Sequence, residues 1–142
     1  MSHRASPADL AFAADFAAGR IAPAAFDHAA HLRLAYVFLT AQSPAEAHRA
    51  MRQALQTFLA KHGVDPARYH ETLTQAWVLA VRHFMDRTPD TASAEELLAA
   101  HPQMRDTRIM LTHYSPELLH SAAARAAFVA PDLSPIPGAA AA

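Results

Sequence analysis

The sequence contains no cysteine and only 3 glycines. The lack of cysteine excludes disulfides, thiolate metal ligands and thiol catalysis. Glycine weakens helix interiors, whereas alanine, which is abundant here, is the best helix former. Residues that favour strands, such as valine, isoleucine and threonine, are sparse. The composition therefore predicts an all-α fold.

Long apolar runs and a concentrated basic face are also missing. No stretch approaches the ~20 apolar residues that a membrane-spanning helix needs. The N-terminal residues are polar and lack the apolar run of a secretory signal peptide. The formal net charge is −1 and the basic residues are scattered, which does not favour phosphate-backbone binding. We expect a cytoplasmic protein with a small-molecule substrate and without membrane or nucleic-acid partners; its oligomeric state stays open.

Helix-start patterns recur along the chain, and its 142 residues suit one domain. Serine followed by proline or by a capping glutamate occurs at Ser6, Ser43, Ser93 and Ser115. These patterns predict a compact bundle of about five or six helices in a single domain, residues 1–130. The expected helical segments are 7–18, 24 or 27 to 39, 44 to a stop at Gly63, 67–85, 94–100, 106–112, a turn or two after Ser115, and 121–128. Residues 131–142 are expected to form a Pro-rich, extended or disordered tail, since Pro131, Pro135 and Pro137 prevent regular helix.

The sequence is unusually rich in histidine, with 10 residues, and histidine is the commonest metal ligand. His28 and His31 are three positions apart, so a helix places them on one face, here the apolar one. His70 is expected on the apolar stripe of the helix over 67–85. Thr74 follows it one turn later on the same stripe, and Trp77 lies beyond Thr74. Three neutral imidazoles with one open position form a known catalytic zinc arrangement, and bundle cores also hold iron and manganese. We therefore expect His28, His31 and His70 to bind a divalent transition metal, with zinc, iron, manganese and copper as the candidates.

Residues beside this predicted metal centre suggest an enzyme. Glu71 is the candidate fourth ligand or general acid/base, and Tyr69 is a candidate proton donor. The substrate pocket is expected to include Thr74, Trp77, Tyr36 and His113. The leading hypothesis is a metal-dependent hydrolase or lyase that acts on a small molecule. If Glu71 is a ligand, two histidines and one carboxylate suggest non-haem iron oxygenase chemistry instead.

Two other functions fit the same pattern. Two histidines at this spacing are common by chance, and a buried histidine only needs hydrogen-bond partners for its ring nitrogens. The first alternative is a non-enzymatic small-molecule-binding protein with buried, hydrogen-bonding histidines. The second is an interaction module, which requires an additional exposed apolar stripe. The sequence shows no such stripe, so this second alternative ranks last.

Three segments of the chain resemble a family of small, uncharacterised bacterial helical proteins. The segments are Phe26–Ala35 with its FxHxxHLxxA pattern, Tyr69–Trp77 with YHETxTxxW, and His113–Arg125 with HYSxxLLxSxxAR. The resemblance covers about residues 20–137 of the chain. It implies that the three segments occur together in one helical protein, which suits a shared site, and it implies no activity.

Overall fold

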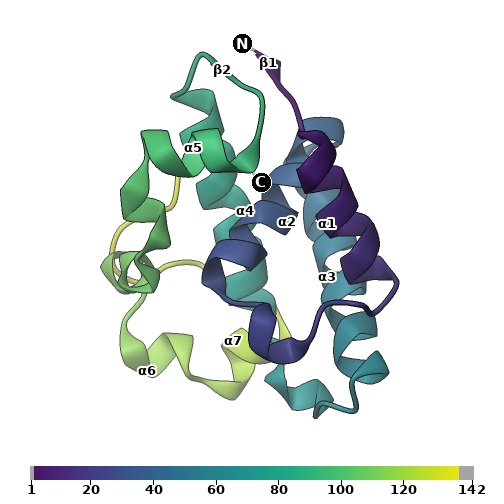
Figure 1. Cartoon of the computed structure of the whole chain (residues 1–142). Coiled ribbons are helices and arrows are strands. Elements are labelled where there is room, and N and C mark those ends of the chain that lie inside the picture. Colours follow the sequence, from purple (N-terminus) through teal and green to yellow (C-terminus); the bar gives the residue numbers. More distant parts are fainter. Residues whose placement is uncertain (1, 138–142) are drawn as a thin grey trace.

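Helices make up most of the described residues, 2–137 of the computed structural model (Figure 1). The α-helices are α1 (Pro7–Ala17), α2 (His28–Ala41), α3 (Pro44–Lys61), α4 (Glu71–Asp86), α5 (Ala94–Ala100), α6 (Pro116–Leu119) and α7 (Ala122–Ala126). Four 3-10 helices connect them: η1 (Pro23–Ala25), η2 (Pro66–Arg68), η3 (Pro102–Arg105) and η4 (Thr107–Thr112). Two short strands, β1 (Ser2–His3) and β2 (Asp90–Thr91), pair in parallel. The predicted all-α class is confirmed, although the described residues form seven α-helices, where a bundle of five or six was expected.

The helix boundaries follow the capping residues seen in the sequence. Ser6 and Ser43 form complete capping boxes, each with the acidic residue three positions later, at the starts of α1 and α3. The Ser93 side chain caps α5. Gly19 and Gly63 follow α1 and α3 with φ angles of 77° and 63°, in the left-handed region that favours glycine. Local chemistry therefore sets where these helices begin and end.

The fourth helix begins later than predicted, and this changes the position of His70. Residues Pro66–Arg68 form the separate 3-10 helix η2, capped by the Asp65 side chain. Tyr69 and His70 then adopt extended backbone angles, and α4 starts at Glu71. The prediction that His70 lies on the apolar stripe of a helix is therefore wrong. His70 is instead the N-cap of α4, and its ring accepts a hydrogen bond from the Leu73 N–H at 3.1 Å.

Helix α4 is central to the bundle and packs against α2, α3 and α7 (Figure 1). Its middle is fully apolar and buried, as a helix covered on several sides requires. Buried Asp9 joins three helices: it accepts hydrogen bonds from Arg33 of α2 at 2.8 Å and from the Ala94 N–H of α5 at 2.9 Å. This arrangement fixes the position of α2, which carries two of the candidate histidines.

The chain after α7 continues without regular helix to residue 137 and returns to the bundle. The Thr72 hydroxyl of α4 donates to the Ala127 carbonyl at 3.0 Å and accepts from the Val129 N–H at 3.1 Å. Ile136 is buried against the core. Residues 138–142, part of the predicted disordered tail, lie outside the described residues. No helix within 2–137 is both long and apolar enough to cross a bilayer.

Candidate functional site

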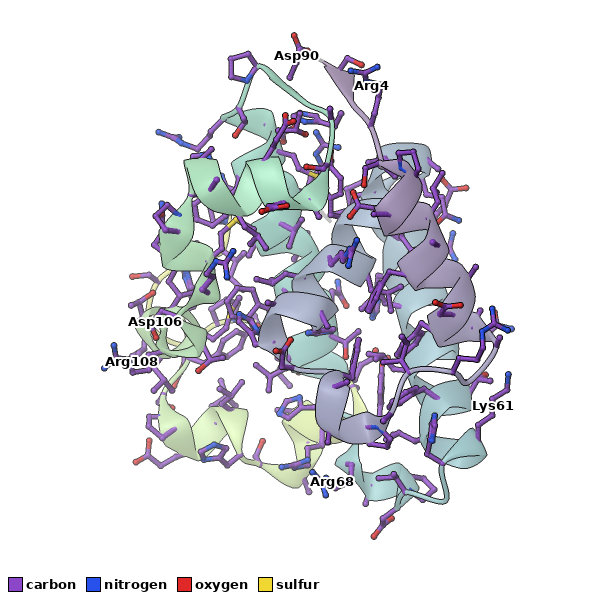
Figure 2. The ribbon with its side chains drawn as sticks, viewed as in Figure 1. Arg4, Lys61, Arg68, Asp90, Asp106 and Arg108 are labelled. Atoms are coloured by element: carbon purple, nitrogen blue, oxygen red, sulfur yellow. The ribbon has the colours of Figure 1, made fainter. Side chains whose placement is uncertain are left out.

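The three candidate histidines line one pocket, although they come from two distant parts of the sequence. The pocket has a volume of about 420 Å³ and lies between the first turns of α2, the second half of α3 and the start of α4. Its apolar lining residues are Pro23, Phe26, Leu55, Phe58, Leu59, Val64 and Leu73. Its polar lining residues are Asp27, His28, His31, Arg68, Tyr69, His70 and Thr74. Figure 2 shows Arg68 at the outer edge of the molecule, consistent with a place at the rim of the pocket.

His31 is the histidine of this pocket whose buried ring nitrogen lacks a partner. The residue keeps some contact with solvent, but its Nε2 atom is buried and forms no hydrogen bond within residues 2–137. The ring meets the edge of Phe26 at a centroid distance of 5.9 Å. Burial, and to a smaller extent electrostatic interaction with His28, lower the pKa of His31 to about 4. At neutral pH His31 is therefore an uncharged imidazole with an unsatisfied polar atom beside an apolar pocket.

His28 has one ring nitrogen engaged with the backbone. Its Nε2–H donates to the carbonyl oxygen of Met104 at 2.9 Å, which links α2 to η3. Because a carbonyl can only accept, this bond places the ring proton on Nε2. The His28 ring also packs edge-on against Trp77, with the ring centroids 4.5 Å apart. Trp77 itself is buried behind His28, where it supports the pocket wall.

His70 uses both ring nitrogens for structural hydrogen bonds. Nδ1 accepts from the Leu73 N–H, and Nε2–H donates to the Leu119 carbonyl oxygen at 2.7 Å. These two partners define an uncharged imidazole, and burial lowers the pKa of His70 in agreement with that state. The ring therefore caps α4 and joins it to the end of α6.

A metal ligand needs a free lone pair on an imidazole nitrogen, and His70 has none to offer in this arrangement. Its single lone pair, on Nδ1, already accepts the Leu73 N–H. Across residues 2–137, no group of three or more histidine, aspartate or glutamate side chains is placed to hold a metal ion. The structure thus gives the predicted three-histidine metal centre no support, even though the three residues meet at one pocket.

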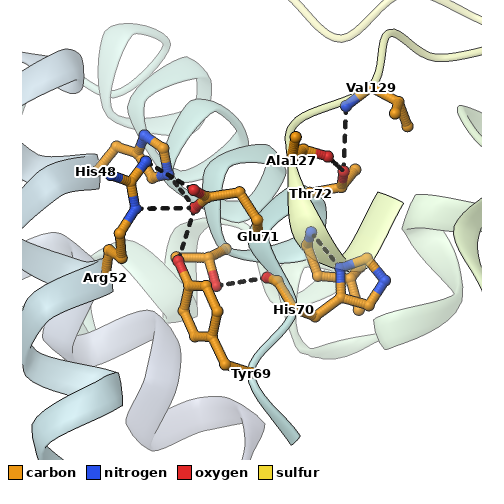
Figure 3. Close-up of polar contacts among 10 residues, drawn as sticks. His48, Arg52, Tyr69, His70, Glu71, Thr72, Ala127 and Val129 are labelled. Carbon is orange, nitrogen blue, oxygen red and sulfur yellow. Dashed lines mark hydrogen bonds and ion pairs between the residues drawn. The ribbon is translucent and has the colours of Figure 1, made fainter. Parts of the chain in front are cut away.

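Glu71 points away from His70 into a separate buried cluster and does not line the histidine pocket (Figure 3). Its Oε1 accepts hydrogen bonds from the Tyr69 hydroxyl at 2.7 Å and from His48 Nε2 at 2.8 Å. The Arg52 guanidinium pairs with Oε2 at 2.6 Å. Burial opposes ionisation of Glu71, but these three donors outweigh it and hold its pKa below the usual value. Glu71 is an ionised acceptor with all its partners supplied by the protein, not a ligand or base facing the pocket.

Tyr69 connects this cluster to the pocket. Its ring lines the pocket, while its hydroxyl proton is donated to Glu71. Burial and the nearby carboxylate raise the pKa of Tyr69 to about 12. A phenol with so high a pKa is a weak acid. Its hydrogen bond to Glu71 therefore favours a positioning role for Tyr69 over the predicted proton-donor role.

Of the remaining residues predicted to line the pocket, one does so and two lie elsewhere. Thr74 lines the pocket and donates its hydroxyl to the His70 carbonyl at 2.8 Å. Tyr36 lies elsewhere, where its hydroxyl bonds to the Arg4 carbonyl and to Thr91. His113 also lies outside the pocket and contacts the Ser134 carbonyl through Nδ1 at 2.8 Å.

Helix α3 contributes residues that were not predicted as site residues, both to the histidine pocket and to the cluster around Glu71. Phe58 forms an apolar wall of the pocket and stacks on Phe16 at 4.6 Å, whereas His48 and Arg52 hold Glu71. His48 and Arg52 are four positions apart, so their shared helix face could be inferred from the sequence. Their pairing with Glu71 could not, because it depends on how α3 packs against α4.

Comparison of the chain with known protein families, with curated proteins and with solved structures finds no match.

Proposed function

We propose that this protein binds a small, uncharged aromatic molecule in the pocket lined by His28, His31 and His70. The observation that carries the proposal is the buried, unpartnered Nε2 of His31. Leaving a buried polar atom without a hydrogen bond costs about 1–3 kcal/mol. A ligand that supplies this bond recovers that energy when it binds. Because Nε2 is itself buried, the His31 ring has to turn towards the pocket for the bond to form.

The rest of the pocket restricts the class of ligand. Its volume of about 420 Å³ lies in the range of small-molecule sites. Phe26 and Phe58 offer aromatic faces, which suit a planar ring. The neutral His31 offers no charge to pair with, so burying a charged group beside it would be costly. A hydroxyl both donates and accepts, and therefore pairs with either tautomer of His31.

A pair of matched probes tests this proposal. p-Cresol and p-xylene have nearly the same shape, but only p-cresol carries a hydroxyl. Binding is followed by ¹H–¹⁵N NMR and by the fluorescence of Trp77, the one tryptophan of the chain, which contacts His28. We expect both probes to shift amides of the pocket residues, and p-cresol to bind about 10-fold more tightly because it gains one buried hydrogen bond.

The variant His31→Leu removes the unpartnered nitrogen and keeps the apolar volume. We expect it to bind p-xylene at least as well as the native protein and to lose the preference for p-cresol. The control is His120→Leu, which replaces an exposed histidine outside the pocket and should keep that preference. If neither probe binds, or if the preference survives in His31→Leu, the proposal is overturned.

The metal-dependent activity expected from the sequence remains a separate prediction, since it requires His70 to leave Leu73 and Leu119. Elemental analysis of untagged protein tests it directly. About one equivalent of zinc, iron, manganese or copper, lost in both His28→Ala and His70→Ala, would establish the metal centre. Metal-free protein after reconstitution with each of these ions would refute it.

A further inference from the structure

A second cavity, of about 690 Å³, occupies the groove between α3 and α4 and shares no lining residue with the histidine pocket. Residues of one face of α3 form one wall: Pro44, Ala45, His48, Arg49 and Arg52. Residues of α4 form the other: Gln75, Val78, Leu79, Arg82, His83 and Asp86. Pro137, the last described residue, also lines the groove.

The charges of this groove are predominantly positive. Three arginines line it, Arg49 and Arg52 from α3 and Arg82 from α4, against a single carboxylate, Asp86. The chain as a whole has a formal net charge of −1, so this excess is a local feature. Arg82 forms an ion pair with Asp86 and Arg52 forms one with Glu71, so the positive charge without an ion pair is that of Arg49. The groove therefore favours an anionic ligand.

Two of these arginines are already held in position. The Arg52 guanidinium is fixed by Glu71 at 2.6 Å, and that of Arg82 by Asp86 through two hydrogen bonds of 2.9 and 2.6 Å. A guanidinium has five N–H donors, so each keeps donors free for a ligand. Arg49 forms no ion pair within residues 2–137, so its donors are free for a ligand, although the Glu46 carboxylate three positions earlier interacts with its charge. Side chains that are ordered beforehand lose less entropy when a ligand binds.

The floor of the groove is apolar. Val78 and Leu79 are buried beneath it, and Pro44 and Ala45 extend the apolar surface along α3. A purely ionic ligand such as phosphate would leave this surface without a partner. An anion joined to an apolar body would use both the arginines and the floor.

We propose that the groove between α3 and α4 binds a small organic carboxylate. Its planar carboxylate lies against the guanidinium groups of Arg49 and Arg82, a geometry that guanidinium matches with paired hydrogen bonds. Its apolar body rests on Val78 and Leu79. This site is independent of the histidine pocket, and either can fail without affecting the other.

The test uses p-toluate and its uncharged analogue p-methylbenzyl alcohol as probes in ¹H–¹⁵N NMR titrations of the full chain. We expect p-toluate to shift amides of residues 44–52 and 75–86, and the alcohol to bind there at least 10-fold more weakly. The double variant Arg49→Gln/Arg82→Gln should weaken p-toluate binding by 10-fold or more. Raising the ionic strength from about 20 mM to about 500 mM should weaken it as well, because the site is partly exposed.

Arg108→Gln is the matched control. Like Arg82, Arg108 pairs with a nearby aspartate, at 2.9 Å, but it lies on η4 outside the groove. We expect this variant and His31→Leu to bind p-toluate as the native protein does. The proposal is overturned if p-toluate shifts only residues of the histidine pocket, if the alcohol binds the groove equally well, or if Arg108→Gln weakens binding as much as the double variant.

Discussion

Acidification tests the environment of His31 most directly. The pKa of His31 is lowered from 6.5 to about 4 in the folded protein, so the unfolded chain takes up a proton at a higher pH than the native state does. Stability that depends on the neutral imidazole is therefore fully present above pH 6.5 and is lost as the pH falls towards 4.

The size of the effect follows from the shift. One pKa unit corresponds to about 1.4 kcal/mol, which sets an upper limit of about 3.5 kcal/mol for His31. Because part of the residue keeps contact with solvent, we expect a loss of about 1–3 kcal/mol. The variant His31→Leu cannot take up this proton and should lose correspondingly less stability over the same pH range.

Urea unfolding followed by circular dichroism at a series of pH values between neutrality and 4 measures the effect in both proteins. The informative quantity is the difference in unfolding free energy between native protein and variant at each pH. His70 and the buried carboxylates titrate in both proteins and cancel from this difference. At neutral pH the variant should be at least as stable, since it lacks the buried unpartnered nitrogen. A difference that stays constant with pH, or an NMR titration of the His31 ring near its ordinary pKa, would refute the reasoning.

Three further substitutions test the contacts that position the site. Asp9→Ala should lower the unfolding free energy by about 2–3 kcal/mol, because Arg33 and the N-terminus of α5 lose their hydrogen-bond acceptor. Urea unfolding measures this loss, and a value below about 0.5 kcal/mol would contradict the prediction. His70→Asn should be about 1 kcal/mol more stable than His70→Ala, since asparagine can still cap α4; equal stabilities would argue against the cap. Glu71→Gln should lower the pKa of Tyr69, because it removes the carboxylate charge beside the phenol; spectrophotometric titration of the tyrosines shows this, and an unchanged pKa would exclude the coupling.

The sequence by itself determined the fold class and most helix ends. Abundant alanine, scarce glycine and the capping serines act within a few residues of each other, so their effects can be recognised without a tertiary structure. The spacing of His28 and His31 likewise placed both on one helix face, and the structure puts both at one pocket.

The start of α4 shows where local reasoning failed. An apolar pattern over 67–85 predicted a continuous helix, but Pro66–Arg68 formed a separate turn and His70 became a cap. The imidazole can cap α4 because Leu119, about fifty residues later, supplies the acceptor for its second nitrogen. That pairing cannot be read from the neighbouring sequence.

Tertiary packing alone decided which side chains share a site. The prediction grouped Glu71 with His70 because the two residues are adjacent. At the start of α4, however, their side chains point to opposite sides, Glu71 towards α3 and His70 towards α6. It likewise could not place Tyr36 beside Arg4 rather than in the pocket. Helix formation depends on neighbours along the chain, while a binding site depends on which helix faces meet. Those faces meet through contacts between residues far apart in sequence, such as Asp9 with Ala94 and Thr72 with Val129.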